Sequence, residues 1–293
     1  MDLKHLRAFV TVAEELHFGR AADKLGIAQP PLSLQIQALE AGLGVRLFER
    51  NRRRVALTDA GRQFLPEARA TLAQAERAWA SARRAARGEL GRLEIGFTGS
   101  APFNAAMPRI ISGVRRRWPD LQLSLREMST SAQFRALTDG SLDIGFVRPG
   151  RSEEAPGIAL RVILREALWV VLPADHPLAE QERIRLAELA DQSFILHPRQ
   201  IGTGLYDKVT GLCRAAGFAP QVVLEAHQMS TIVSLAAAGV GISIVPEAMR
   251  RLQVEGARFV AIADPGADMV LSIACRQDDS RPAVHHVLDE AQL

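Results

Sequence analysis

The chain has 293 residues, of which 47% are hydrophobic, and its formal net charge is +3. This length allows two or three domains, each with a hydrophobic core of its own. Only two cysteines occur, Cys213 and Cys275, which argues against a disulfide framework and favours a reducing compartment. Residues 231–246 are apolar but too short and too glycine-broken to span a bilayer, so we expect a soluble, cytoplasmic protein without a membrane partner.

The first 44 residues carry the spacing of three short helices. Apolar residues recur at helical intervals over residues 3–16 and again over residues 18–25. Gly26 then allows a tight turn, because a residue without Cβ tolerates the backbone dihedrals that the turn demands. The Pro-Pro pair at 30–31 suits only the first turn of a helix, so a third helix is expected to begin near Gln29.

The third helix is expected to have one buried and one exposed face. The buried face carries four apolar residues spaced to pack on the first two helices: Leu32, Ile36, Leu39 and Leu43. The exposed face, with the residue that starts the helix, carries five candidate DNA contacts: Gln29, Pro30, Ser33, Leu34 and Gln37. Such a helix fits the major groove, where Gln37 favours adenine and Leu34 a thymine methyl group. A small helical bundle whose outer residues only contact water is the alternative.

A basic segment follows directly and shifts the balance toward DNA. Five arginines fall within nine residues, opposed only by Glu49: Arg46, Arg50, Arg52, Arg53 and Arg54. Residues 55–57 can return as a short strand, so the segment resembles the wing of a winged helix-turn-helix. Arginine side chains suit phosphate oxygens and a narrow minor groove. We therefore expect residues 1–58 to form a winged helix-turn-helix domain, all-α apart from its wing, that binds double-stranded promoter DNA.

Residues 59–88 predict one long helix capped by Thr58. Its apolar residues recur at alternating spacings of three and four: Leu65, Ala68, Leu72, Ala75, Trp79, Ala82 and Ala86. This heptad pattern favours a helix that pairs with the same helix of a second chain, whereas a helix lying on its own domain is the alternative. Charge divides at the same place. Residues 1–88 hold 15 Lys and Arg against 9 Asp and Glu, and the remainder holds 21 against 24, so the basic surface is confined to the N-terminal third.

Residues 89–293 alternate between strand and helix patterns. The first series has strands at 93–97, 121–125 and 142–147 with helices at 107–118 and 133–138. A second series, from about 162 to 264, has five short strands: 168–172, 193–196, 222–224, 242–245 and 259–262. A strand at 269–275 and a helix at 282–291 end the chain. This βαβ alternation predicts an α/β domain with a parallel sheet covered by helices on both faces.

The chain resembles the LysR-type transcriptional regulators. The N-terminal likeness rests on HLRAFVTVAEELHFGRAADKLGIAQPPLSLQIQALEAGLGVRLFER and LTDAG, and the later likeness on IGFTGS, LDIGFVR, ADHPLA and AAAGVGISIVP. Two positions depart from the family pattern: Ala28 stands where a serine often caps the recognition helix, and Leu34 where arginine is common. Within the family, the chain resembles members that respond to benzoate or muconate in aromatic catabolism.

The resemblance implies a two-lobed effector domain like the periplasmic binding proteins. Lobe I would comprise about 89–161 and 269–293, and lobe II about 162–268. It also implies a dimer through the linker helix, assembly into a tetramer and contact with RNA polymerase. Effector binding between the lobes would alter their closure and so the spacing or bending imposed on DNA.

Ligands of open α/β sheets bind outside the carboxyl ends of strands. Three such places carry hydroxyl groups or helix starts that favour a carboxylate, and their candidate residues are Ser100, Thr130, Arg148, Thr203 and Gly204. Each hydroxyl alone is more often an ordinary helix cap. On resemblance, Ser100 and Thr130 match positions that bind carboxylates in benzoate-responsive or muconate-responsive members, so a small aromatic or unsaturated acid is expected.

No catalytic constellation, cofactor motif or metal site is expected. GFTGSAP lacks the spacing of a nucleophile elbow, and GVGIS has no third glycine. His285 and His286 are adjacent on a helix and point about 100° apart, which is poor geometry for one metal ion. The competing hypothesis is a solute-binding or enzymatic α/β protein whose N-terminal helices only assemble subunits.

Overall fold

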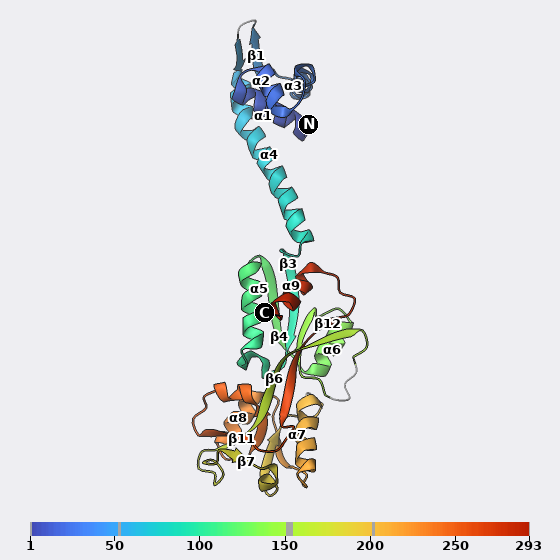
Figure 1. Cartoon of the computed structure of the whole chain (residues 1–293). Helices are drawn as coiled ribbons and strands as arrows, with labels where there is room; N and C mark the ends of the chain where they lie inside the picture. The colour runs from blue at the N-terminus through green and yellow to red at the C-terminus, as the bar shows by residue number, and fades with distance from the viewer. Residues whose placement is uncertain (1, 52–53, 151–154, 201–202, 293) are drawn as a thin grey trace. The chain divides into compact units, whose positions relative to one another are not determined.

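A computed structural model describes residues 2–51, 54–150, 155–200 and 203–292 (Figure 1). The chain divides into two compact units, Met1–Arg84 and Ala85–Leu293. The predicted phosphate contacts Arg52 and Arg53 lie outside the described residues. For Arg50, Arg54 and Thr203 the structure describes the backbone.

The N-terminal unit contains the three predicted helices. They are α1 (Leu3–Glu15), α2 (Phe18–Leu25) and α3 (Gln29–Leu43). Gly26 lies in the left-handed region at φ +67°, which confirms the turn that the sequence predicts between α2 and α3. The wing is a hairpin of two antiparallel strands, β1 (Phe48–Asn51) and β2 (Arg54–Leu57). The sequence predicts the second strand but not the first.

The apolar face of α3 is buried, with one exception. Leu32, Ile36 and Leu39 are each at most 3% exposed and pack in the core of the unit. Leu43 is 38% exposed, so the prediction that it packs on the other helices is wrong. Leu43 is the last residue of α3, and Gly44 turns the chain away at φ +70° before Leu43 can be covered.

The long helix α4 (Asp59–Ala86) begins as predicted. The Thr58 hydroxyl accepts a hydrogen bond from Gly61 N at 2.9 Å and donates one to the Arg46 carbonyl at 2.8 Å. Gly61 must remain small, because a Cβ there would stand 2.2 Å from the Leu47 carbonyl oxygen. The first turns of α4 therefore lie against the chain that enters the wing.

The heptad stripe of α4 has two different environments. Leu65, Ala68 and Leu72 pack on the core formed by α1, α2 and α3, so the expectation that the whole stripe awaits a partner helix is wrong for these residues. The ring centroid of Phe64 on α4 lies 5.2 Å from that of Phe9 on α1, so the first half of α4 faces the core of its own unit. Trp79 is 51% exposed, and Ala82 and Ala86 are exposed as well.

The C-terminal unit begins with the predicted βαβ series. Strands β3 (Gly91–Phe97), β4 (Leu121–Glu127) and β5 (Ile144–Val147) are parallel, in the order β4, β3, β5. Helix α5 (Ala106–Arg117) packs on one face and α6 (Thr130–Thr138) on the other. The parallel sheet with helices on both faces is confirmed for this part of the chain.

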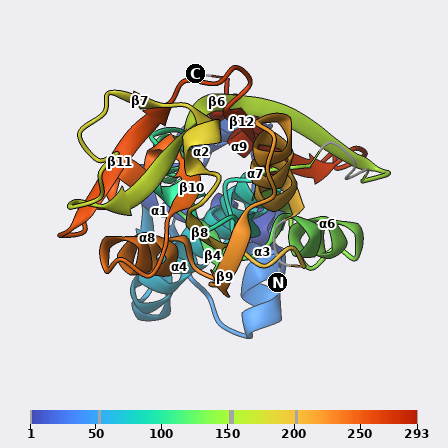
Figure 2. The same cartoon turned by 90° about the horizontal axis from the view of Figure 1, so that it is seen from below.

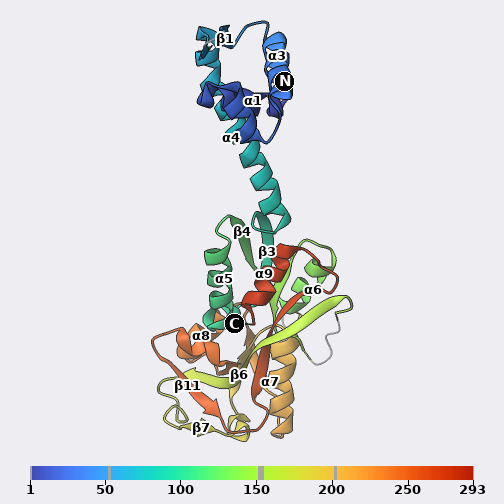
Figure 3. The same ribbon diagram turned by 45° about the horizontal axis from the view of Figure 1, so that its top comes forward.

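Two long strands join the lobes. Strand β6 (Ile158–Pro173) and strand β12 (Asp268–Arg276) run antiparallel along each other, and Figure 3 shows both passing from one lobe into the other. The main sheet is therefore mixed rather than purely parallel, because β12 pairs antiparallel with both β5 and β6. The sequence pattern predicts only residues 168–172 of β6, where both faces are buried.

The second lobe is built on shorter strands. Strands β10 (Ser243–Pro246) and β11 (Ala257–Ile262) pair antiparallel with β6, and the short β7 (Arg183–Ile184) pairs with β11. Strands β8 (Ser193–Leu196) and β9 (Gln221–Glu225) form a separate parallel pair. Short 3-10 helices complete the unit: η1 (Ala101–Phe103), η2 (Leu186–Leu189) and η3 (Glu247–Arg251).

Side-chain alternation explains why two helices cover the second lobe. Phe194 and Leu196 of β8 pack toward α7 (Thr203–Ala215), whereas Ile195 between them packs toward α8 (Met229–Ala237). Figure 2 shows α7 and α8 on either side of β8, β9 and β10. A helix N-terminus from each side thus comes close to the ends of the strands.

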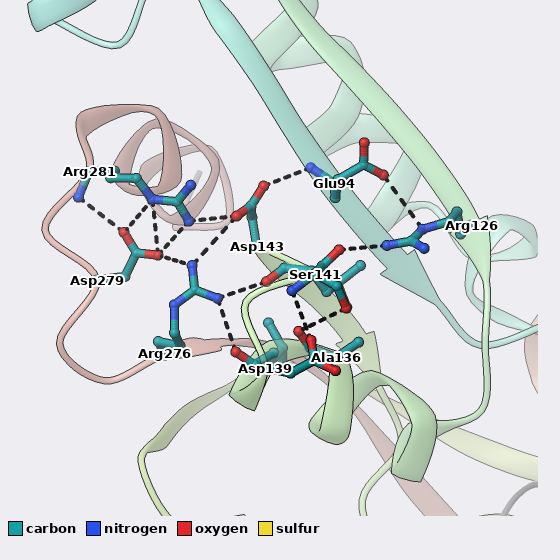
Figure 4. A network of polar contacts seen from close by, with 11 residues as sticks. Glu94, Arg126, Ala136, Asp139, Ser141, Asp143, Arg276, Asp279 and Arg281 are labelled. Carbon is teal, nitrogen blue, oxygen red and sulfur yellow. Dashed lines mark hydrogen bonds and ion pairs between the residues drawn. The ribbon is translucent and has the colours of Figure 1, made fainter.

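The chain finally returns to the first lobe, as the resemblance implies. Helix α9 (Pro282–Glu290) packs on α5, with Val284 and Val287 buried in the same core as Ile110. A network of hydrogen bonds fixes the segment between β12 and α9 (Figure 4). In this network Asp279 and Asp143 accept hydrogen bonds from Arg276 and Arg281. The Arg281 and Arg276 guanidinium groups lower the pKa of Asp279 to about 2.

Candidate nucleic-acid interface and ligand pocket

The exposed face of α3 carries the predicted DNA contacts. Gln29, Pro30 and Gln37 are exposed, Ser33 is half-buried, and Leu34 is 65% exposed. Pro30, Ser33, Leu34 and Gln37 project away from the buried face of the helix, whereas Gln29 is the first residue of the helix. Leu34 therefore presents apolar surface next to the polar side chains of Ser33 and Gln37.

Helix α3 has no side-chain cap at Ala28, and the two prolines that follow reduce the need for one. Ala28 makes no side-chain hydrogen bond to α3. A capping side chain accepts from the second or third backbone N–H of a helix, and in α3 these positions are prolines, which have no N–H. The loss of the serine that is common in the family therefore leaves fewer unsatisfied donors than it would in another helix.

Glu40 connects the exposed helix to the wing. Its carboxylate, near the end of α3, accepts hydrogen bonds from the backbone N–H groups of Leu47 at 2.8 Å and Phe48 at 3.1 Å. Phe48 is buried against Phe9, with ring centroids 5.3 Å apart. The start of the wing is thus held at a fixed place relative to α3, although sequence patterns do not single out Glu40.

A cavity of about 330 Å³ lies where the strands of the two lobes end. Its lining joins four of the five predicted ligand residues, Ser100, Thr130, Arg148 and Gly204. The side chain of Thr203, the fifth, lies outside the described residues. A larger hollow of about 820 Å³ is lined mainly by α7 and the segment that follows it, and by none of the five predicted ligand residues. We therefore take the smaller cavity as the candidate ligand pocket.

Arg148 organises the pocket from its buried position at the end of β5. Its Nε donates to the Ser100 hydroxyl at 2.8 Å, and its backbone N–H donates to the Thr130 hydroxyl at 3.1 Å. The Thr130 hydroxyl in turn donates to the Arg148 carbonyl at 3.3 Å. Both predicted hydroxyls are thus already engaged with Arg148 rather than standing free in the cavity.

The charge of Arg148 is balanced inside the protein. Its Nη2 pairs with the carboxylate of Glu166 on β6, and the two side chains are 4% and 6% exposed. The second Glu166 oxygen accepts from Ala248 N at 2.8 Å. Burial lowers the pKa of Arg148, and the Glu166 carboxylate opposes that shift. Because arginine stays protonated in proteins, the structure contains a buried ion pair. Nη1 of Arg148 has no hydrogen-bond partner among the described residues.

Gly204 allows the start of α7 to pack closely against the end of β5. A Cβ at this position would stand 2.1 Å from the Arg148 carbonyl oxygen, so no other residue fits without movement. The first turn of α7 therefore lies directly against the end of β5. This contact places the N-terminus of α7, which is the positive end of its helix dipole, beside the cavity.

The sequence patterns do not single out eight other lining residues: Thr98, Glu127, Met128, His197, Leu205, His227, Gln228 and Met229. His197 and His227 each follow a strand of the parallel β8–β9 pair, so the rule of strand ends could have found them. Nδ1 of His197 lies 3.1 Å from the Ala226 carbonyl, and burial lowers the pKa of its imidazole.

Comparison with known proteins assigns both units. Residues 3–62 match the family model described as "Bacterial regulatory helix-turn-helix protein, lysR family", and residues 86–292 match that of the "LysR substrate binding domain". The chain belongs to the LysR family of transcriptional regulators. This LysR-family chain is 46% identical to the HTH-type transcriptional regulator YnfL of Escherichia coli (strain K12), over 91% of the chain and 89% of the relative. It is 36% identical to BenM of Acinetobacter baylyi (strain ATCC 33305 / BD413 / ADP1), over 99% and 94%.

Solved structures agree with this assignment. The crystal structure of CbnR, a LysR family transcriptional regulator, matches with a TM-score of 0.88 and 30% identity, over 99% of this chain and 100% of CbnR. Full-length CbnR in complex with its target DNA matches with a TM-score of 0.85 and 29% identity, over 100% and 99%. The family members are transcriptional regulators and not enzymes, so the alternative of an enzymatic or solute-binding protein is not favoured. This LysR-family protein is a DNA-binding transcriptional regulator with an effector-binding domain.

Within the described residues, no helix is long and apolar enough to cross a membrane. The described part of the chain also holds no group of three His, Cys, Asp or Glu side chains that could bind a metal ion. Cys213 and Cys275 are buried and unpaired with each other, and burial raises the pKa of the Cys213 thiol to about 11.

Proposed function

We propose that the exposed face of α3 reads promoter DNA in the major groove. The observation that carries this proposal is the exposure of Gln37, Ser33 and Leu34 on the side of α3 opposite its buried face. Gln37 would form paired hydrogen bonds with an adenine, and Leu34 would contact a thymine methyl group. Gln29 and Pro30 would lie at the rim of the groove.

The wing would supply the contacts that do not depend on sequence. The arginines proposed for this role are Arg50, Arg52, Arg53 and Arg54, and their pairing with phosphate would release counterions from the DNA. The register of the hairpin, with Arg50 opposite Val55 and Asn51 opposite Arg54, supports this role because it brings the backbones of Arg50 and Arg54 to the same end of the wing. These contacts would set affinity, whereas α3 would set sequence preference.

A gel-shift titration against the DNA upstream of the chain's own coding region tests both roles. Gln37→Ala is expected to reduce the preference for the specific site, with a loss of about 1–3 kcal/mol there and little loss on unrelated DNA. Replacing Arg52, Arg53 and Arg54 by alanine is expected to weaken binding to all sequences and to flatten the salt dependence. A salt-insensitive wild-type complex, or a Gln37→Ala protein with unchanged preference, would contradict the proposal.

We also propose that the protein acts in the cytoplasm as a dimer joined through α4 and that dimers pair into tetramers. The exposed second half of the α4 stripe, from Trp79 to Ala86, supports this contact because it leaves apolar surface uncovered. Two α3 helices would then be offered to the two halves of a pseudo-palindromic site. Contact with RNA polymerase would follow from the altered bend of the DNA.

The effector proposed for the pocket is a small carboxylate, in the class of acids produced by aromatic degradation. The size of the cavity, the buried Arg148 and the helix starts at Thr130 and Met229 support an anion of this size. Binding between the lobes would favour a more closed arrangement, and only a difference in affinity between the two states can drive that change.

Calorimetric titration with a panel of small acids tests the pocket. Ser100→Ala and Thr130→Val are expected to weaken binding of the acid that the wild type binds, because both hydroxyls position Arg148. Unchanged affinity in both variants would rule out their role in binding.

A further inference from the structure

The pocket has little net positive charge to offer a ligand. Its buried cation, Arg148, is paired with the buried carboxylate of Glu166. The remaining attraction for an anion comes from helix starts and from single hydrogen-bond donors. The starts of α6, α7 and α8 lie at the lining, and each helix start acts as roughly half a positive charge. Together they offset roughly one and a half negative charges.

One donor in the pocket is both buried and unused. The Arg148 side chain lines the cavity at 4% exposure, and its Nη1 has no partner among the described residues. A buried donor without an acceptor is costly, and a ligand oxygen would remove that cost. The Thr98 hydroxyl, also in the lining, is likewise buried without a partner in the described part of the chain. A carboxylate is therefore expected at the side of the pocket that Arg148 occupies.

The same cavity also presents acceptors. Glu127, the last residue of β4, is exposed, and among the described residues its side-chain carboxylate has no hydrogen-bond or ion-pair partner, whereas its backbone pairs with Phe97 in the sheet. Its Oε1 lies 2.7 Å from the point where a Cβ of Gly99 would stand, and Met229 Cγ lies 3.8 Å from that point. The carboxylate therefore lies close to Gly99 at the lining of the cavity, near Met229 at the start of α8.

A second acceptor comes from the other lobe. The Ala226 carbonyl can only accept a hydrogen bond, so the proton of the neutral His197 ring is on Nδ1. Nε2 of His197 is then an acceptor, and the ring lines the cavity. The pocket thus has a hydrogen-bond donor at Arg148 and acceptors at Glu127 and His197. A simple carboxylate has no donor group, so it would leave these two acceptors without a ligand partner.

We propose that the effector is an aminocarboxylate, with its single carboxylate at Arg148 and its ammonium group at Glu127. This inference rests on the proposed carboxylate pocket and narrows its ligand class. Among the described lining residues Arg148, already paired, is the one lysine or arginine, so the repulsion between a second carboxylate and Glu127 would not be offset and dicarboxylates are disfavoured. An ammonium group would pair with Glu127 and donate to His197, and it would offset the negative charge of Glu127.

Two matched sets of probes test the inference on the full-length protein by isothermal titration calorimetry. The first set is pentanoate, glutarate, norvaline and 5-aminopentanoate, and the second is benzoate, terephthalate and 4-(aminomethyl)benzoate. We expect one amino acid in a set to bind at least about tenfold more tightly than its unsubstituted acid, and the diacid to bind more weakly. Glu127→Gln is expected to abolish the advantage of the amino acid and to strengthen binding of the diacid.

Glu182→Gln is the matched control, because Glu182 is an exposed glutamate outside the pocket lining. It should leave every affinity unchanged, and both variants should unfold at the wild-type temperature. If simple acids or diacids bind best and Glu127→Gln has no effect, the inference is wrong while the carboxylate pocket stands. If no probe of either set binds, the carboxylate pocket fails and the inference fails with it.

Discussion

Loss of one charge in the buried Arg148–Glu166 pair should strongly destabilise the C-terminal unit. In a Glu166→Gln protein the side chain keeps its shape, and its amide oxygen can still accept from Ala248 N, which lies 2.8 Å from Glu166 in the native structure. The Arg148 guanidinium, only 4% exposed, would lose its counter-charge without gaining water. The variant therefore isolates the effect of a buried unpaired cation.

The expected cost follows from general experience with such pairs. Removing one partner of a buried ion pair costs about 3–5 kcal/mol. In a unit of this size each kcal/mol lowers the melting temperature by about 2–4 °C, so a fall of about 6–20 °C is expected. Arg148→Met together with Glu166→Gln should be more stable than Glu166→Gln alone, because the unpaired charge is gone.

Urea unfolding of the full-length protein measures these free energies. Intrinsic fluorescence is a suitable signal, because Trp118 and Trp169 both lie in the C-terminal unit. Arg165→Met is the matched control on the same strand: its ion pair with Asp268 is on the surface, with Arg165 68% exposed, and should contribute less than about 1 kcal/mol. The reasoning is refuted if Glu166→Gln costs no more than this control.

Three further results are expected. Asp279→Asn should lower the free energy of unfolding by up to about 2 kcal/mol at neutral pH. The native pKa of Asp279 is about 2, against 3.8 for the ordinary group, so this contribution is present above about pH 4 and is lost as the pH falls toward 2; a pH-independent difference would contradict it. Gly204→Ala should cost about 1–3 kcal/mol in urea unfolding, because its Cβ meets the Arg148 carbonyl, whereas Gly211→Ala in the same helix has free space and should not destabilise. Leu34→Arg should raise the salt slope of DNA binding by about one, and an unchanged slope would argue against contact of this face with phosphate.

Local patterns in the sequence predict most of the elements. Helix spacing, glycine turns and the proline pair place α1, α2 and α3 to within a residue or two, because these signals act between near neighbours in the chain. The same signals fail at Leu43, whose exposure depends on where the chain goes after Gly44. They also fail for the first half of α4, where the partner of the stripe is its own unit.

For the candidate pocket, too, the sequence predicts some residues and not others. The rule of strand ends singles out Ser100, Thr130 and Arg148 from the sequence, and the structure brings them together around one cavity. Glu166 could not be found in this way, because it lies in the middle of a strand and meets Arg148 only after the long strands have crossed between lobes. Its presence changes the expected charge of the pocket.

By itself, the sequence determined the winged helix-turn-helix pattern, the division of charge along the chain and the βαβ order, since each depends on residues close together in the chain. Only the tertiary structure decided which apolar stripe is already covered, which hydroxyls are already bonded and which cation is already paired. Those outcomes depend on contacts between residues far apart in sequence, and burial, hydrogen bonding and charge compensation are properties of such contacts.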